Sequence, residues 1–119
     1  MEETFNVGNP TKDNIIYAFK NLMFYINASI QLKIYKEYKK KFEKVSDKIN
    51  NVLAIYINNE KLSLINEEIL QDIKFDLIDL DVETKELKSY YAEWSLLWLE
   101  SIISLRVSEI KIGGIENGR

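Results

Sequence analysis

The stretch SYYAEWSLLWLESIISL, residues 89–105, places apolar side chains around nearly the whole circumference of a helix. It contains both tryptophans of the chain, and residues 96–99 put large apolar groups on every side of one turn. A helix that is apolar almost all round must also be covered almost all round. We therefore expect a central or interface helix here, enclosed by the other elements.

Length and composition indicate a single helical domain. The chain has 119 residues, of which 46% are hydrophobic and 29% are charged, with one proline and four glycines. A chain of this size forms one domain, and so few helix-breaking residues favour long helices. The acidic N-terminus lacks the basic region of a signal peptide, and no apolar run approaches the roughly 20 residues that span a bilayer. We expect a cytoplasmic protein without a membrane partner.

Cysteine and histidine are both absent from the sequence. Their absence excludes disulfides and thiolate nucleophiles, and it removes the commonest general base and the commonest transition-metal ligand. No catalytic or cofactor motif stands out among the remaining residues. The sequence therefore predicts a protein that is not an enzyme and needs no cofactor or metal.

Apolar residues recur at steps of three or four through the first half of the chain. They are Ile15, Phe19, Leu22, Ile26, Ile30, Ile34, Tyr38, Phe42, Val45 and Ile49. This spacing predicts an amphipathic helix that begins at a cap, either Asn9 or Thr11. The steps of four between Leu22 and Phe42 turn the stripe by roughly 40° each. The helix therefore either crosses its partners obliquely or kinks near residues 33–35; unbroken from residue 11 to 45, it would be about 50 Å long.

Residues 52–65 allow two interpretations. Read as strands, their β-branched and aromatic residues flank the polar turn at residues 58–61 and form a short β-hairpin. Read as helix, the periodicity of the first half continues and ends at Asn58-Asn59. We slightly prefer the helix, because an isolated two-stranded hairpin is marginally stable.

The second half of the chain contains two further helix signals. Asn66 followed by two glutamates predicts a helix start, and the periodic apolar residues after it end near residues 79–81. Asp81 or Thr84 is expected to cap the last helix, and Gly113-Gly114 to terminate it. We expect flexible tails at residues 1–9 and 115–119. The predicted fold is mainly α, an antiparallel bundle of three or four helices, with the hairpin at residues 52–65 as an alternative.

Two charged segments have opposite signs. Residues 33–48 hold seven lysines and three acids, and residues 66–86 hold eight acids and two lysines. The basic segment suggests nucleic-acid contact through Lys33, Lys36, Lys40 and Lys44. The acids Asp72, Asp76 and Asp79 share a helix face, which suggests either a divalent-cation site or, as we prefer, a solvated or ion-paired face. If the two helices are antiparallel, the two segments neutralise each other.

The function that the sequence favours is protein binding. The apolar helix at residues 89–105 and the lack of catalytic side chains suggest a small interaction or regulatory module. Such modules include the accessory proteins of phages, plasmids and viruses, which bind or inhibit a larger protein. The predicted interface comprises Tyr91, Trp94, Trp98, Ile102 and Leu105, which contact a protein partner or a second copy in a homodimer. The alternative function is nucleic-acid binding along the basic segment.

Overall fold

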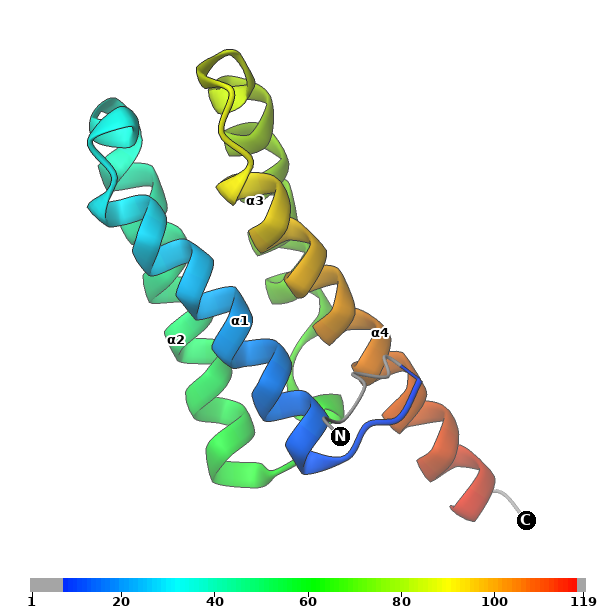
Figure 1. Cartoon of the computed structure of the whole chain (residues 1–119). Helices are drawn as coiled ribbons and strands as arrows, with labels where there is room; N and C mark the ends of the chain where they lie inside the picture. Colours follow the sequence, from blue (N-terminus) through cyan, green and yellow to red (C-terminus); the bar gives the residue numbers. More distant parts are fainter. Residues whose placement is uncertain (1–7, 118–119) are drawn as a thin grey trace, which may run out of the picture.

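The chain forms four α-helices that run alternately up and down (Figure 1). The computed structural model describes the backbone of residues 8–117, with side chains up to Gly113. The helices are α1 (Lys12–Gln31), α2 (Lys39–Asn59), α3 (Glu67–Thr84) and α4 (Tyr91–Asn117). Short 3₁₀ turns connect them: η1 (Lys33–Tyr38), η2 (Leu62–Leu64) and η3 (Lys85–Leu87). The predicted mainly α antiparallel bundle is confirmed, and residues 8–117 contain no strand.

The first predicted helix is in fact two antiparallel helices. Thr11 caps α1, its hydroxyl accepting a hydrogen bond from the backbone N–H of Asn14 at 3.2 Å. The chain leaves the helix at Leu32, which has extended backbone angles, and reverses through η1. An unbroken helix from residue 11 to 45 was therefore wrong, and in place of the kink expected near residues 33–35 the chain reverses direction completely there. The reversal brings Tyr35 into the core, where its ring stacks on Phe42 with centroids 5.1 Å apart.

Residues 52–65 do not form the alternative β-hairpin. Residues 52–59 continue α2, as the preferred interpretation stated, and Glu60 ends it in the left-handed conformation with φ of 54°. The helical conformation is favoured because its spacing puts Val52 and Tyr56 on one buried face. There the Tyr56 ring stacks on the Phe19 ring of α1, with centroids 6.1 Å apart. A hairpin would place consecutive side chains on opposite faces and break this stripe.

The boundaries of the last two helices differ in part from the prediction. Asn66 caps α3 as expected, its Oδ1 accepting from the Glu68 N–H at 2.7 Å, but α3 extends beyond residues 79–81 to Thr84. Neither Asp81 nor Thr84 caps α4; both lie within α3, where the Thr84 hydroxyl donates to the carbonyl of Leu80 at 2.7 Å. The last helix begins only at Tyr91.

The glycine pair does not terminate α4. The helix continues through Gly113-Gly114 to Asn117, and no glycine among the described residues adopts the positive φ of a helix-ending cap. The predicted tail at residues 115–119 is therefore helical up to residue 117. Residues 1–7 and 118–119 lie outside the described part of the chain, so the rest of the tail prediction concerns residues that the structure does not describe.

One core runs between the four helices, and α4 occupies a corner of the bundle. Its inward face is buried against α1, α3 and η2 through Ala92, Ser95, Leu99, Ile102 and Leu105. Its opposite face carries Leu97, whose side chain is half-exposed. Of the two alternatives, the fully enclosed central helix is therefore wrong, and the interface helix stays a prediction. One apolar side of α4 is covered by the chain itself and another is left at the surface.

Candidate functional site

Aromatic rings from α1 and α4 gather where these two helices meet. The Tyr25 ring of α1 contacts the rings of both Tyr91 and Trp94 of α4, with centroid distances of 5.8 Å and 5.3 Å respectively. Tyr91 and Trp94 themselves lie 5.6 Å apart. Aromatic pairs at such distances contribute about 0.5–1.5 kcal/mol beyond their burial. The rings therefore hold one another in fixed positions at the helix boundary.

The same boundary continues towards the start of α1. Tyr17 meets Trp98 edge-to-face at 5.5 Å, and Phe24 meets Tyr25 at 5.2 Å. Tyr17 thus lies level with Trp98 and Tyr25 lies level with Tyr91 and Trp94, as expected for antiparallel helices. Tyrosines of α1 therefore contact tryptophans of α4 at two levels of this boundary, which we call the seam.

The seam opens to the surface as a face without charge, which we call the aromatic face. From α1 it includes Tyr17, Asn21, Phe24, Tyr25 and Ala28. From α4 it includes Trp94, Leu97, Trp98 and Ser101, together with Tyr90, which directly precedes the helix. The exposed fractions are 61% for Phe24, 52% for Leu97, 50% for Tyr90, 49% for Tyr17 and 39% for Trp94. Exposed apolar side chains that are contiguous in this way are typical of binding surfaces.

The predicted interface residues divide between this face and the core. Tyr91, Trp94 and Trp98 lie at the seam, with Trp94 the most exposed of the three. Ile102 and Leu105 are both 0% exposed, because they point between the helices into the core of the chain. In the folded chain these two residues stabilise the bundle and offer no surface to a partner.

Sequence reasoning missed the contribution of α1. Residues 21–32 contain no charged side chain, although 29% of the chain is charged. A helix with one buried stripe normally carries charges on its remaining surface. The uncharged stretch indicates that a second side of α1 is apolar. The three- and four-residue spacing of apolar residues does not reveal this second side, because that spacing identifies only the buried stripe.

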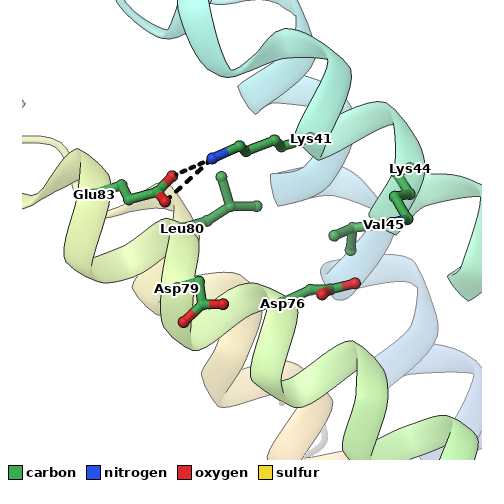
Figure 2. A pocket seen from close by; sticks show the side chains of 7 residues that line it. All are labelled: Lys41, Lys44, Val45, Asp76, Asp79, Leu80 and Glu83. Atoms are coloured by element: carbon green, nitrogen blue, oxygen red, sulfur yellow. Dashed lines mark hydrogen bonds and ion pairs between the residues drawn. The ribbon is translucent and has the colours of Figure 1, made fainter.

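The basic and acidic segments face each other across α2 and α3. Lys41 donates to both oxygens of Glu83, at 2.9 Å and 3.1 Å, as Figure 2 shows. Lys48 donates to Asp72 at 2.6 Å and to Asp76 at 2.7 Å. The numbering rises along α2 as it falls along α3, so the antiparallel arrangement is confirmed, and the two segments neutralise each other at Lys41 and Lys48.

These contacts affect the protonation of the two lysines. The hydrogen bond to Glu83 raises the pKa of Lys41 above its usual value. The hydrogen bonds to Asp72 and then Asp76 raise the pKa of Lys48 in the same way. Both amines therefore stay charged through the neutral range and hold α2 against α3.

The four lysines expected to contact nucleic acid are all exposed, but they do not share one helix. Lys33 and Lys36 lie on η1, whereas Lys40 and Lys44 lie on α2 beyond the break in the chain. None of the four takes part in an ion pair among the described residues. Lys44 lines a shallow pocket of about 180 Å³ between α2 and α3 (Figure 2).

The acidic face of α3 lacks the arrangement of a metal site. The amine of Lys48 lies between Asp72 and Asp76, so a cation is already provided by the chain. Among the described residues no group of three acidic side chains is placed to hold a metal ion. The ion-paired interpretation of Asp72 and Asp76 is confirmed.

Similarity to other proteins gives no information about the function of the chain. No family model, no curated protein and no solved structure matches the chain. Within residues 8–117, no helix has the length and apolar character needed to cross a membrane.

Proposed function

We propose that the protein is a non-enzymatic interaction module that binds a protein through its aromatic face and acts by occluding or assembling that partner. The observation that carries this proposal is the exposure of Phe24, Trp94 and Leu97 on the uncharged aromatic face, where Tyr25 contacts the rings of both Phe24 and Trp94. Tryptophan and tyrosine are the residues most often found as energetic anchors of protein interfaces. An uncharged centre with charges only at its edge is also the composition of an interface core.

Packing supports the same proposal. The rings of Tyr25, Tyr91 and Trp94 contact one another and are backed by the bundle core, so their positions are fixed before a partner arrives. A fixed aromatic anchor loses little conformational entropy on binding. This surface therefore suits the recognition of a folded partner better than a mobile loop would.

The experiment that tests the proposal compares one substitution on the face with a matched one elsewhere. Leu97→Glu puts a charge in the centre of the aromatic face, and Val82→Glu puts the same charge on the exposed side of α3. Immobilised wild type and Val82→Glu should retain the same protein from an extract of cells that encode the chain, and Leu97→Glu should lose it. Purified partner should then shield the tryptophans from acrylamide quenching, because both indoles lie at the seam.

The proposal fails if Leu97→Glu retains the same proteins as the wild type and leaves self-association unchanged. Circular dichroism of each variant serves as the folding control. Both substituted side chains are more than half exposed in the wild type, so neither replacement buries a charge.

A second candidate function is nucleic-acid contact at the end of the bundle that carries η1 and η3. The Tyr35 hydroxyl in η1 donates a hydrogen bond to Oγ of Ser89, which follows η3, at 2.6 Å, and so links these two connecting segments. That end displays Lys33, Lys36, Lys39, Lys40, Lys85 and Lys88, all exposed. Lysines clustered in this way can neutralise phosphates. Binding to single- or double-stranded DNA or RNA should weaken with salt and with Lys33→Glu; no binding at low salt excludes it.

A further inference from the structure

We propose that the partner of the aromatic face is a second copy of this chain, related by a two-fold axis that runs along the seam between α1 and α4. The inference rests on the proposed function, since it takes the aromatic face as a binding surface and names the occupant. In this arrangement α1 of one copy covers α4 of the other, because rotation about the seam exchanges the two helices. Three features of the described residues support it.

The first feature is the sign of the charges on the two edges of the face. Lys20 lies on the outer edge of α1, and Glu93 and Glu100 lie on the outer edge of α4. Rotation about the seam places the α1 edge of each copy against the α4 edge of the other. Lys20 of each copy therefore meets the acidic edge of the other, while the uncharged centre brings no like charges together. Asp13, seven residues before Lys20 on the same side of α1, is the one acid on that edge among the described residues of the helix, and it lies at the start of α1.

The heights of these charges along the bundle also agree. Tyr17 lies level with Trp98, and Tyr25 lies level with Tyr91 and Trp94. Lys20 is therefore level with the part of α4 between Glu93 and Glu100, and an axis parallel to the helices preserves that height. Glu100 contacts Lys74 of its own chain at 3.8 Å. Neither Lys20 nor Glu93 takes part in an ion pair among the described residues.

The second feature is the match in height between the projecting ring of α1 and the exposed apolar side chains of α4. Phe24 is the most exposed ring of the face, and it lies level with the start of α4. Tyr90 and Leu97 are seven residues apart, so they stand about 10 Å apart along α4 on the same side. The rotation places Phe24 of one copy over the interval between Tyr90 and Leu97 of the other. Each two-fold dimer contains this contact twice.

The third feature is the amount of apolar surface. Large side chains bury roughly 150–250 Å² when fully covered. With the exposed fractions given above, the five most exposed members of the face offer on the order of 500 Å². A standard interface covers about 800 Å² per partner, and about 65% of a homodimer interface is apolar. The aromatic face therefore has the apolar area that one side of such a dimer requires.

Sedimentation velocity across a wide concentration range tests the inference. The wild type should shift with concentration from the 14.0 kDa chain towards twice that mass. Leu97→Glu should remain at 14.0 kDa, whereas Val82→Glu should behave as the wild type. Acrylamide quenching of the tryptophans should fall over the same concentrations in the wild type and in Val82→Glu, but not in Leu97→Glu.

Charge reversal at the edges tests the two-fold geometry without touching the core. Lys20→Glu and Glu93→Lys should each weaken the dimer about fivefold at low salt, since each change affects two symmetry-related pairs. The double variant Lys20→Glu/Glu93→Lys should regain the wild-type dissociation constant within about twofold. Restoration of this kind is specific to a second copy, because a different protein would not carry the compensating change.

Two results would overturn the inference. One is a wild type that stays at 14.0 kDa at every concentration, and the other is a double variant that dimerises no better than the single ones. If the wild type is monomeric but a captured protein still depends on Leu97, the proposed function stands and the second copy is excluded. If neither self-association nor capture depends on Leu97, both proposals fail.

Discussion

Replacing Glu109 by alanine should destabilise the bundle, because this carboxylate on α4 holds the backbone of another element. Its Oε1 accepts a hydrogen bond from the Ser63 N–H at 2.7 Å, and its Oε2 accepts one from the Leu62 N–H at 3.1 Å. The turn η2 has no side-chain cap of its own. Glu109 therefore supplies the acceptors that the first N–H groups of η2 lack, and it fixes the α2–α3 connection against α4.

The magnitude follows from the two hydrogen bonds. A hydrogen bond to a charged group contributes about 1.5–3 kcal/mol, and the lower value applies here because the site is only partly buried. Removing both bonds with Glu109→Ala should then cost about 3 kcal/mol of unfolding free energy. At an unfolding entropy of about 2.1 cal/mol/K per residue, this lowers Tm by about 12 °C for a chain of this length. Glu109→Gln keeps one acceptor oxygen and should lose about 2 kcal/mol.

Urea unfolding followed by circular dichroism provides the measurement. The matched control is Lys111→Ala, an exposed position two residues further along α4, which should change stability by less than about 0.5 kcal/mol. The expected order of stability is wild type and Lys111→Ala, then Glu109→Gln, then Glu109→Ala. Equal stability of Glu109→Ala and Lys111→Ala would refute the reasoning that Glu109 caps η2.

Lys48→Met should lower stability by about 1 kcal/mol at neutral pH, because it leaves Asp72 and Asp76 without their shared cation. The raised pKa of Lys48 means that this contribution is complete below pH 10.5 and is lost as the pH rises through the higher folded value, so variant and wild type should converge in strongly alkaline urea titrations. Tyr35→Phe removes the buried hydroxyl that joins η1 to the segment before α4 and should cost about 1–2 kcal/mol in thermal unfolding; an unchanged Tm would contradict the role of that bond. Leu22→Ala, at a fully buried core position, should cost about 3 kcal/mol by calorimetry, and a loss below about 1 kcal/mol would mean that Leu22 is not packed as described.

Local signals in the sequence were sufficient for the helical class and for several helix ends. The periodic residues from Ile15 to Ile26 predict α1. Asn66 and Thr11, the latter as one of two alternatives with Asn9, are predicted caps because a short polar side chain reaches the first free N–H groups of its own helix. The interpretation of Gly113 was wrong for the opposite reason. Glycine ends a helix only where the chain turns into the left-handed region, and α4 continues straight through it.

Contacts between distant residues determined what local signals left open. The choice between a helix and a hairpin at residues 52–65 depended on whether Tyr56 finds a ring to pack against, and that ring is Phe19 in another helix. The expected ion pairing of the two charged segments required antiparallel α2 and α3, which the fold supplied through Lys41 and Lys48. Sequence alone could state that condition but could not show that it is met.

The aromatic face shows the same division most clearly. By itself the sequence determined that the part of residues 89–105 that is helical, residues 91–105, has more apolar surface than one buried stripe needs, because the periodicity of a helix fixes which residues share a side. Which of those residues face inward was decided by the position of α4 at a corner of the bundle, where Ile102 and Leu105 turn to the core and Trp94 and Leu97 turn to the surface. The partnership of Trp94 with Tyr25 likewise joins residues far apart in the chain, and only packing of α1 on α4 creates it.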